Sequence, residues 1–241
     1  MRQNYQSKFA AVWLAFTVML LLSASEPAGA TEYELDRDNS IFAVITHKAG
    51  FASGLAHDHM VYPSEFEVEL SISDDAETLE ASEFRLSFPV KNLVVDDLTS
   101  KNRWFPHIKK LKIKNEDFPN VSGSDRKKIR EAMLSESQLN ASAFPEFLAR
   151  VTNIESLTDA EGRSAFSHRV TVETHLHGAT VAKEFQASIQ EVEGKLTVEA
   201  VGKYRFTEFG IEPYSAFFGA VKNKDDFEVF VYLTASRTEK R

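Results

Sequence analysis

Four histidines, arranged as two close pairs, are the side chains of this sequence best suited to holding a metal ion. Only 7 histidines occur among the 241 residues, yet His57 lies two positions from His59, and His175 lies two positions from His177. Apolar and polar side chains alternate over residues 169–177, as in a half-buried strand, so His175 and His177 project from one face. If the 57–59 loop folds over that strand, the four imidazoles could bind zinc or copper. The other interpretation is a hydrogen-bonded cluster that binds no metal.

A second stretch, residues 101–114, combines positive charge with aromatic side chains. Its sequence is KNRWFPHIKKLKIK, which contains several lysines and one arginine but no aspartate or glutamate. Such a composition suits the surface of an anionic membrane, where each basic side chain contributes about 1 kcal/mol. We expect this stretch to allow a transient contact with a membrane surface. The alternative is a solvated insertion whose aromatic side chains pack onto the body of the protein.

No catalytic constellation of adequate spacing is found in the sequence. There is no Gly-x-Ser-x-Gly, no phosphate-binding glycine loop and no His-Glu-x-x-His, and the absence of cysteine rules out thiol chemistry. Asp96 and Asp97 are adjacent carboxylates at a predicted strand end, where neighbouring residues point to opposite faces, so a turn or cap is expected. A net charge of −8 argues against nucleic acid as a partner. We therefore expect a protein without catalysis and without a required cofactor.

Alternating side chains recur along the chain and predict an all-β protein. Apolar residues occupy every second position in 65–73, in 83–90 and again near the C-terminus. Eight candidate strands can be recognised, at residues 41–47, 65–73, 83–90, 146–154, 165–176, 181–191, 195–206 and 226–236. Eight antiparallel strands can close into a barrel that holds one small ligand.

The segment between the third and fourth candidate strands is too long for an ordinary loop. Within it, residues 125–135 predict a helix, with Ser124 as the N-cap and Ile129, Ala132 and Met133 on one side. Its expected role is to plug one end of the barrel.

The N-terminus has the layout of a secretory signal peptide over residues 1–30. Arg2 and Lys8 supply the basic start, residues 9–22 form an apolar core, and Ala28-Gly29-Ala30 offers a small-residue cleavage site. The apolar core is shorter than the roughly 20 residues that span a bilayer. We expect cleavage after Ala30, which leaves residues 31–241 as one domain.

Five segments carry a resemblance to a known family. In chain order they are IFAVITHKAGFASGLAHDH (41–59), LVVDD (93–97), MLSESQLNASAFPEF (133–147), THLHGATVAKEF (174–185) and FGIEPYSAFFGAV (209–221). Together they resemble the YceI-like family of polyisoprenoid-binding, lipocalin-like proteins over about residues 33–235. The resemblance implies an eight-stranded antiparallel lipocalin-like barrel with a helical insertion between the third and fourth strands. It also implies that His177, next to Gly178, fixes a turn through a hydrogen bond.

The resemblance further implies a function. A long isoprenoid lipid, of the quinone or polyprenyl type, would lie inside the barrel of a non-catalytic, periplasmic carrier. On this view the candidate wall residues are Phe51, Phe66, Phe84, Phe88, Phe147, Phe185, Phe206 and Phe230. For each of them an ordinary packed core is the alternative. A periplasmic metal-binding protein that uses the four histidines is the competing function, and the sequence leaves open whether two copies pair as a homodimer.

Overall fold

The computed structural model describes residues 30–51, 56–73, 83–157 and 165–238. The expected signal peptide lies outside the described residues, except for Ala30, which is the first residue of strand β1. No helix in these ranges is long and apolar enough to cross a membrane.

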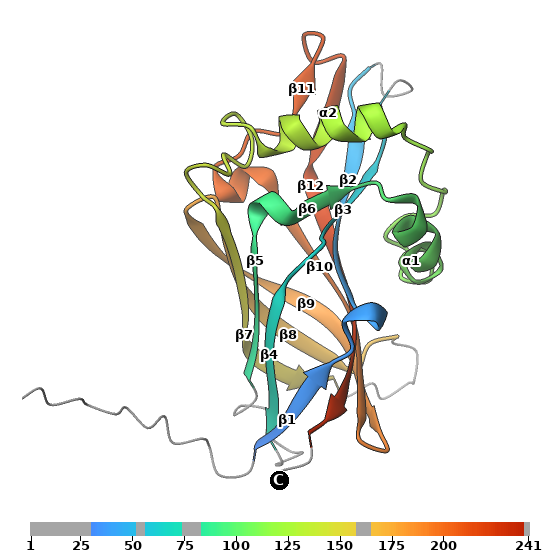
Figure 1. The fold of residues 1–241 in the computed structure, drawn as a ribbon, viewed down its shortest axis with the longest axis vertical. Coiled ribbons are helices and arrows are strands. Elements are labelled where there is room, and N and C mark those ends of the chain that lie inside the picture. The colour runs from blue at the N-terminus through green and yellow to red at the C-terminus, as the bar shows by residue number, and fades with distance from the viewer. Residues whose placement is uncertain (1–29, 52–55, 74–82, 158–164, 239–241) are drawn as a thin grey trace, which may run out of the picture.

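Antiparallel strands form one continuous wall that closes on itself (Figure 1). Around the wall the order is β1, β4, β5, β7, β8, β9, β10 and β12, and β12 pairs with β1 to close the barrel. A further part of β12 pairs with β2, followed by β3 and β6. The strands are β1 (Ala30–Leu35), β2 (Ile41–Ala49), β3 (His59–Pro63), β4 (Glu67–Ser73), β5 (Glu83–Pro89), β6 (Leu93–Val95), β7 (Glu146–Ser156), β8 (His168–Leu176), β9 (Ala179–Val192), β10 (Lys195–Arg205), β11 (Ser215–Ala216) and β12 (Val221–Arg237).

The first three strands of the wall are bent, and each bend divides a strand into two pieces. β1 and β2 both pair with β12, β4 pairs with β1, and β3 pairs with β2. The next strand repeats this division, because β5 pairs with β4 and β6 pairs with β3. Counting each bent strand once, the barrel is an eight-stranded antiparallel meander, which confirms the predicted fold class.

Short turns of 3-10 helix produce two of these bends. The bends explain why the sequence did not predict every short strand. The two turns are η1 (Arg37–Asn39) and η4 (Val90–Asn92). Asp36 caps η1 by accepting the Asn39 backbone N–H at 3.1 Å. At the bend between β3 and β4, Ser64 donates its backbone N–H to the Asn92 carbonyl at 3.0 Å. The bends interrupt the alternation, so the short pieces β1, β3 and β6 were not predicted.

Two helices occupy the insertion between the third and fourth wall strands: α1 (Leu98–Lys110) and α2 (Gly123–Leu134). α2 corresponds to the predicted helix but starts earlier, because Ser122 rather than Ser124 is its N-cap and accepts the Asp125 backbone N–H at 3.1 Å. It lies across the upper end of the barrel in Figure 1, where Ile129 and Met133 pack against the interior. The helical insertion is thus confirmed, while α1 was not predicted as a helix.

The hairpin that joins β8 to β9 has a two-residue turn at His177 and Gly178. Both residues have positive φ, 52° and 76° respectively, as the central residues of a type I′ turn require. Leu176 and Ala179 are paired directly across it. The predicted strand break at this point is therefore a tight hairpin that fixes the register of β8 against β9.

Candidate functional site

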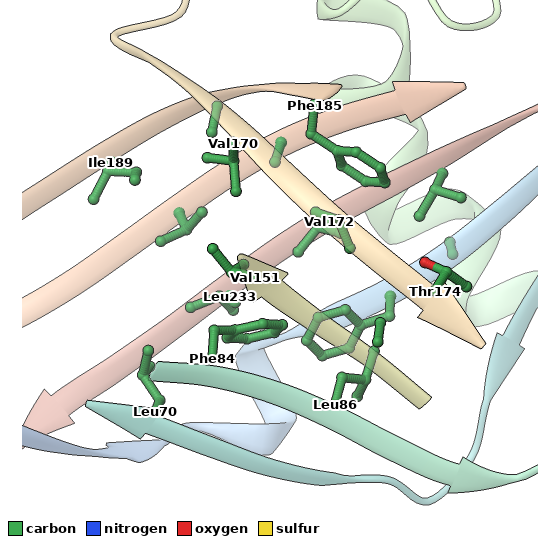
Figure 2. Close-up of a pocket in the computed structure, with 18 of the residues that line it drawn as sticks. Leu70, Phe84, Leu86, Val151, Val170, Val172, Thr174, Phe185, Ile189 and Leu233 are labelled. Carbon is green, nitrogen blue, oxygen red and sulfur yellow. The ribbon is translucent and has the colours of Figure 1, made fainter. Parts of the chain in front are cut away.

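The interior of the barrel contains a cavity of about 440 Å³, within the range of about 300–1,000 Å³ typical of small-molecule sites. Side chains at alternate positions of the wall strands turn toward it, as Phe84, Val172 and Ile189 do in Figure 2. Aliphatic residues make up much of the lining, among them Leu70, Leu86, Val151, Val170, Val198 and Leu233. The site is therefore an apolar chamber that suits a hydrocarbon guest.

Small residues in the wall help to keep this chamber open. Ala187 of β9 and Ala200 of β10 are direct cross-strand partners, and both line the cavity. Gly202 lies under the Phe185 ring, since a Cβ atom at position 202 would fall 2.2 Å from a ring carbon. The missing side chain lets the ring lie close against the wall.

One buried polar pair is embedded in the lining. The Tyr204 hydroxyl lies 2.7 Å from the Thr174 hydroxyl, and each residue is buried. Burial raises the pKa of Tyr204 to about 12, although the hydrogen bond with Thr174 acts in the opposite direction. The two hydroxyl groups satisfy each other, so this part of the wall presents no unpaired polar group to a guest.

Polar lining residues gather at the end of the barrel where β1 begins and β12 ends, at the bottom of Figure 1. There the Arg237 guanidinium contacts the Glu191 carboxylate at 2.8 Å. Burial and the neighbouring Glu191 raise the pKa of Tyr33. Burial lowers the pKa of His168, whose Nδ1 lies 2.7 Å from the Ser167 hydroxyl, and this favours the neutral imidazole. This end could contact the polar head of an amphiphilic ligand.

The opposite end of the barrel is closed by the turn η5 (Phe206–Phe209) together with α2. Phe209 is buried against the interior, and its carbonyl accepts a hydrogen bond from His177 Nδ1 at 3.0 Å. Lys183 pairs with Glu208 at 2.5 Å. Burial acts to raise the pKa of Glu208, but hydrogen bonds from Lys183 and from the Arg205 backbone outweigh it and hold the pKa below its usual value. Lys183, whose cross-strand partner Val172 lines the cavity, is therefore neutralised by Glu208.

Two solved structures share this architecture. BcnA of Burkholderia cenocepacia matches with a TM-score of 0.55 at 10% identity, covering 84% of this chain and 100% of that chain. A polyisoprenoid-binding domain from Saccharophagus degradans, implicated in plant cell wall breakdown, matches with a TM-score of 0.51 at 11% identity, covering 86% of this chain and 99% of that one. The chain has the fold of this polyisoprenoid-binding domain. This confirms the predicted YceI-like resemblance at the level of the fold. No protein-family model and no curated protein matches the sequence.

Four of the eight predicted wall phenylalanines line the cavity of the barrel. They are Phe84, Phe88, Phe147 and Phe185. Phe88 and Phe147 stack with their ring centroids 4.4 Å apart. These four come from the adjacent strands β5 and β7 and from β9, and the fold brings them into one space.

The other four predicted wall phenylalanines do not line the cavity. Phe51 is exposed at a turn, and Phe206 packs in η5 against Phe227. Phe66 precedes β4 and contacts Phe42. Phe230 lies on the outer side of β12, because the inward positions of this strand are odd-numbered. The alternation of β12 already contained that information.

Three further phenylalanines line the cavity but were not among the predicted wall residues: Phe42, Phe209 and Phe227. Phe227 could have been found from the alternation of β12. Phe42 could not, because β2 is buried on both faces and its sequence shows no polar side to identify the other. Phe209 lies in η5, outside any alternating segment.

The structure does not bring the four predicted histidine ligands together. His59 Nδ1 lies 2.6 Å from Asp96, and His57 is exposed beside it. His175 Nδ1 lies 3.0 Å from the Thr180 hydroxyl, and His177 is held by the hydrogen bond to η5 described above. Among the described residues, no three His, Cys, Asp or Glu side chains are grouped so as to hold a metal ion. The geometry gives this alternative function no specific support.

The basic stretch 101–114 is fastened to the outside of the barrel. Trp104 and Ile108 of α1 are buried against β2, β3 and β12, where Trp104 packs near Phe230. Three lysines are used in ion pairs with the barrel body: Lys110 with Glu199 at 2.8 Å, Lys114 with Asp58 at 2.5 Å, and Lys101 with Asp96 at 3.6 Å. This arrangement corresponds to the alternative interpretation, an insertion packed onto the protein.

The adjacent carboxylates Asp96 and Asp97 both have structural roles. Asp97 is the N-cap of α1 and accepts the Ser100 backbone N–H at 2.9 Å. Asp96 is buried and accepts the Met60 backbone N–H at 3.1 Å. The predicted role of a cap is confirmed for Asp97.

Proposed function

We propose that the protein is a non-catalytic carrier of the YceI-like type that holds a long isoprenoid lipid, either a quinone or a polyprenyl compound, inside its barrel. The observation that carries this proposal is the apolar cavity of about 440 Å³. The fold shared with a polyisoprenoid-binding domain supports the same ligand class. A signal peptide over residues 1–30, cleaved on export, would place the carrier in the periplasm.

The energetics of such a carrier favour exchange over permanent capture. Transferring a tail of about 40 carbons out of water is worth on the order of 30 kcal/mol, at about 0.8 kcal/mol per methylene. A membrane offers the tail the same gain, so the barrel needs only to match the bilayer. Net affinity then depends on the fit of the chain to the cavity and on contacts to the head group. The polar end with Tyr33, His168 and Arg237 would supply those contacts.

Extraction of the protein from its native compartment tests the proposal. The mature chain would be purified without detergent, extracted with organic solvent and analysed by mass spectrometry. We expect an isoprenoid lipid in stoichiometric amount. Protein that yields no lipid, and that takes up no isoprenoid after incubation with loaded vesicles, would refute the carrier function.

A matched pair of substitutions separates the cavity from the surface. Val172→Glu places a carboxylate in the cavity, whereas Thr171→Glu alters the neighbouring residue, which does not line the cavity. We expect the first variant to lose lipid uptake, because an unpaired charge in an apolar chamber is strongly disfavoured. The second should retain uptake. Equal uptake by two folded variants would place the lipid outside the barrel.

A further inference from the structure

Three fully or largely exposed phenylalanines lie together at the upper tip of the barrel. Phe51 is 89% exposed, Phe217 79% and Phe218 109%. Phe51 follows the end of β2, while Phe217 and Phe218 lie in the turn between β11 and β12. The two turns are in contact, since a Cβ on Gly50 would fall 2.4 Å from the Ala220 carbonyl oxygen. We call Phe51, Phe217 and Phe218 the aromatic tip.

The backbone of the aromatic tip holds its side chains in water at a conformational cost. Phe217 and Phe218 have φ values of 52° and 56°, in the left-handed region that bulky residues rarely occupy. The β11–β12 hairpin rises beyond α2 at the top of Figure 1. Large apolar side chains on a projecting turn, with strain in their own backbone, indicate a surface that contacts a partner.

Unpaired positive charges surround the aromatic tip. Segments 48–51 and 214–224 contain Lys48, Lys222 and Lys224 but no acidic residue, in a chain whose net charge is −8. Lys222 pairs with Ala49 and Asn223 pairs with Lys48 across β12 and β2, so the Lys222 and Lys48 side chains leave opposite faces of this two-stranded ribbon. None of the three ammonium groups has an ion-pair partner among the described residues. The two residues after Lys224 are acidic: Asp225 accepts hydrogen bonds from the Thr207 backbone and hydroxyl at 3.0 and 2.7 Å, and Asp226 pairs with Lys203 at 3.1 Å.

We propose that the aromatic tip, with Lys48, Lys222 and Lys224, docks the protein on the surface of an anionic lipid bilayer. Phenylalanine side chains can insert among the acyl chains while neighbouring lysines contact anionic head groups. Docking through this tip leaves the polar end of the cavity pointing away from the bilayer. The proposal does not depend on the identity of the cargo.

Vesicle flotation with the full mature chain tests this docking. The probes are vesicles of phosphatidylcholine alone and vesicles that also contain phosphatidylglycerol. We expect binding to the anionic vesicles only, and weakening by salt because the lysine contribution is screened. Equal binding to both kinds of vesicle, or to neither, would overturn the proposal.

Two sets of variants locate the contact. The double variant Phe217→Gly and Phe218→Gly should reduce vesicle binding by about tenfold or more for each side chain removed. Its thermal midpoint should not fall, because glycine adopts positive φ without strain. The double variant Lys222→Glu and Lys224→Glu should abolish the preference for anionic vesicles. Val192→Ser, at an exposed apolar position at the other end of the barrel, is the matched control and should bind normally.

Two outcomes would assign the contact elsewhere. Loss of vesicle binding in Lys109→Glu with Lys112→Glu, but not in the aromatic tip variants, would place the membrane contact on the basic stretch 101–114. Conversion of a dimer to a monomer by the glycine variant, without any vesicle binding by the unaltered chain, would show that the tip contacts a second copy. Either result overturns the proposal.

Discussion

Replacing Ala187 with leucine tests whether the cavity is empty space or is filled by the surrounding side chains. Ala187 is 1% exposed, lines the cavity and faces Ala200 across the β9–β10 pair, so this part of the wall carries only two methyl groups. Leucine adds three carbon atoms. If these enter empty space, they bury new apolar surface at about 0.8 kcal/mol per carbon, or about 2 kcal/mol of added stability for the empty protein.

The opposite sign is expected if the interior is already full. Forcing extra carbons into a packed core destabilises a protein by about 1–3 kcal/mol. The measurement is the free energy of unfolding of the lipid-free protein in urea. Ala182→Leu is the matched control, because Ala182 is exposed on the same strand and reports the change in strand propensity alone.

Lipid binding supplies the second half of this test. The new leucine occupies room that about three methylenes of a guest would fill, so affinity for the lipid should fall by about fiftyfold. Competition with a fluorescent fatty-chain probe would measure it. A variant that is less stable than the control and binds lipid as before would refute our assignment of the cavity.

Three other predictions address groups in and around the barrel. Tyr204→Phe and Thr174→Val should each lower the free energy of unfolding by about 1–3 kcal/mol, because each leaves a buried hydroxyl unpaired, and the double variant should lose less than the sum; additive losses would contradict the pairing. Because the pKa of His168 is lowered in the folded protein, the unfolded state binds this proton at a higher pH than the folded state does. The free energy of unfolding should therefore decline as the pH falls below about 6.5. His168→Gln should reduce that decline in urea unfolding, and an unchanged slope would rule His168 out as its source. Burial acts to raise the pKa of Asp58, but hydrogen bonds from Lys114 and the Lys48 backbone outweigh it and hold the pKa low; the resulting stability is present above about pH 3.8 and is lost as the pH falls through the lowered pKa. Lys114→Met should shrink this acid-sensitive contribution, and an identical acid profile would show that the pair adds nothing.

Most of the eight predicted strands could be recognised from the sequence because their period of two reflects burial on one face only, whereas β2 is buried on both faces and shows no such period. β4, β5 and β12 show this plainly, and the turn at His177-Gly178 marks a hairpin through residue types that tolerate positive φ. The short strands β1, β3 and β6 were not predicted, because a strand of three to six residues at a bend shows too little alternation to be recognised.

The basic stretch 101–114 shows how the same composition can have two roles. Its lysines and aromatic residues match a membrane-binding sequence, yet the structure uses Trp104 and Ile108 to cover the outside of the barrel. The partner of Lys110, Glu199 of β10, is 89 positions away in sequence, and that of Lys114, Asp58, is 56 positions away. Pairing at that separation is decided by the fold and cannot be read from local composition.

The aromatic tip is another feature that only the assembled barrel reveals. Phe51 and Phe217 lie far apart in the chain, and each alone has the appearance of a residue for the core. They come together because β2 and β12 are neighbours in the closed wall.

Local patterning by itself determined the strand class, the number of long strands, the position of the insertion and the tight hairpin, since each depends on residues within one turn or strand of each other. Tertiary structure alone decided which phenylalanines face inward, that small residues leave a cavity between them, and that the histidine pairs stay apart. Those outcomes depend on how strands distant in sequence meet when the sheet closes, and no local period encodes that meeting.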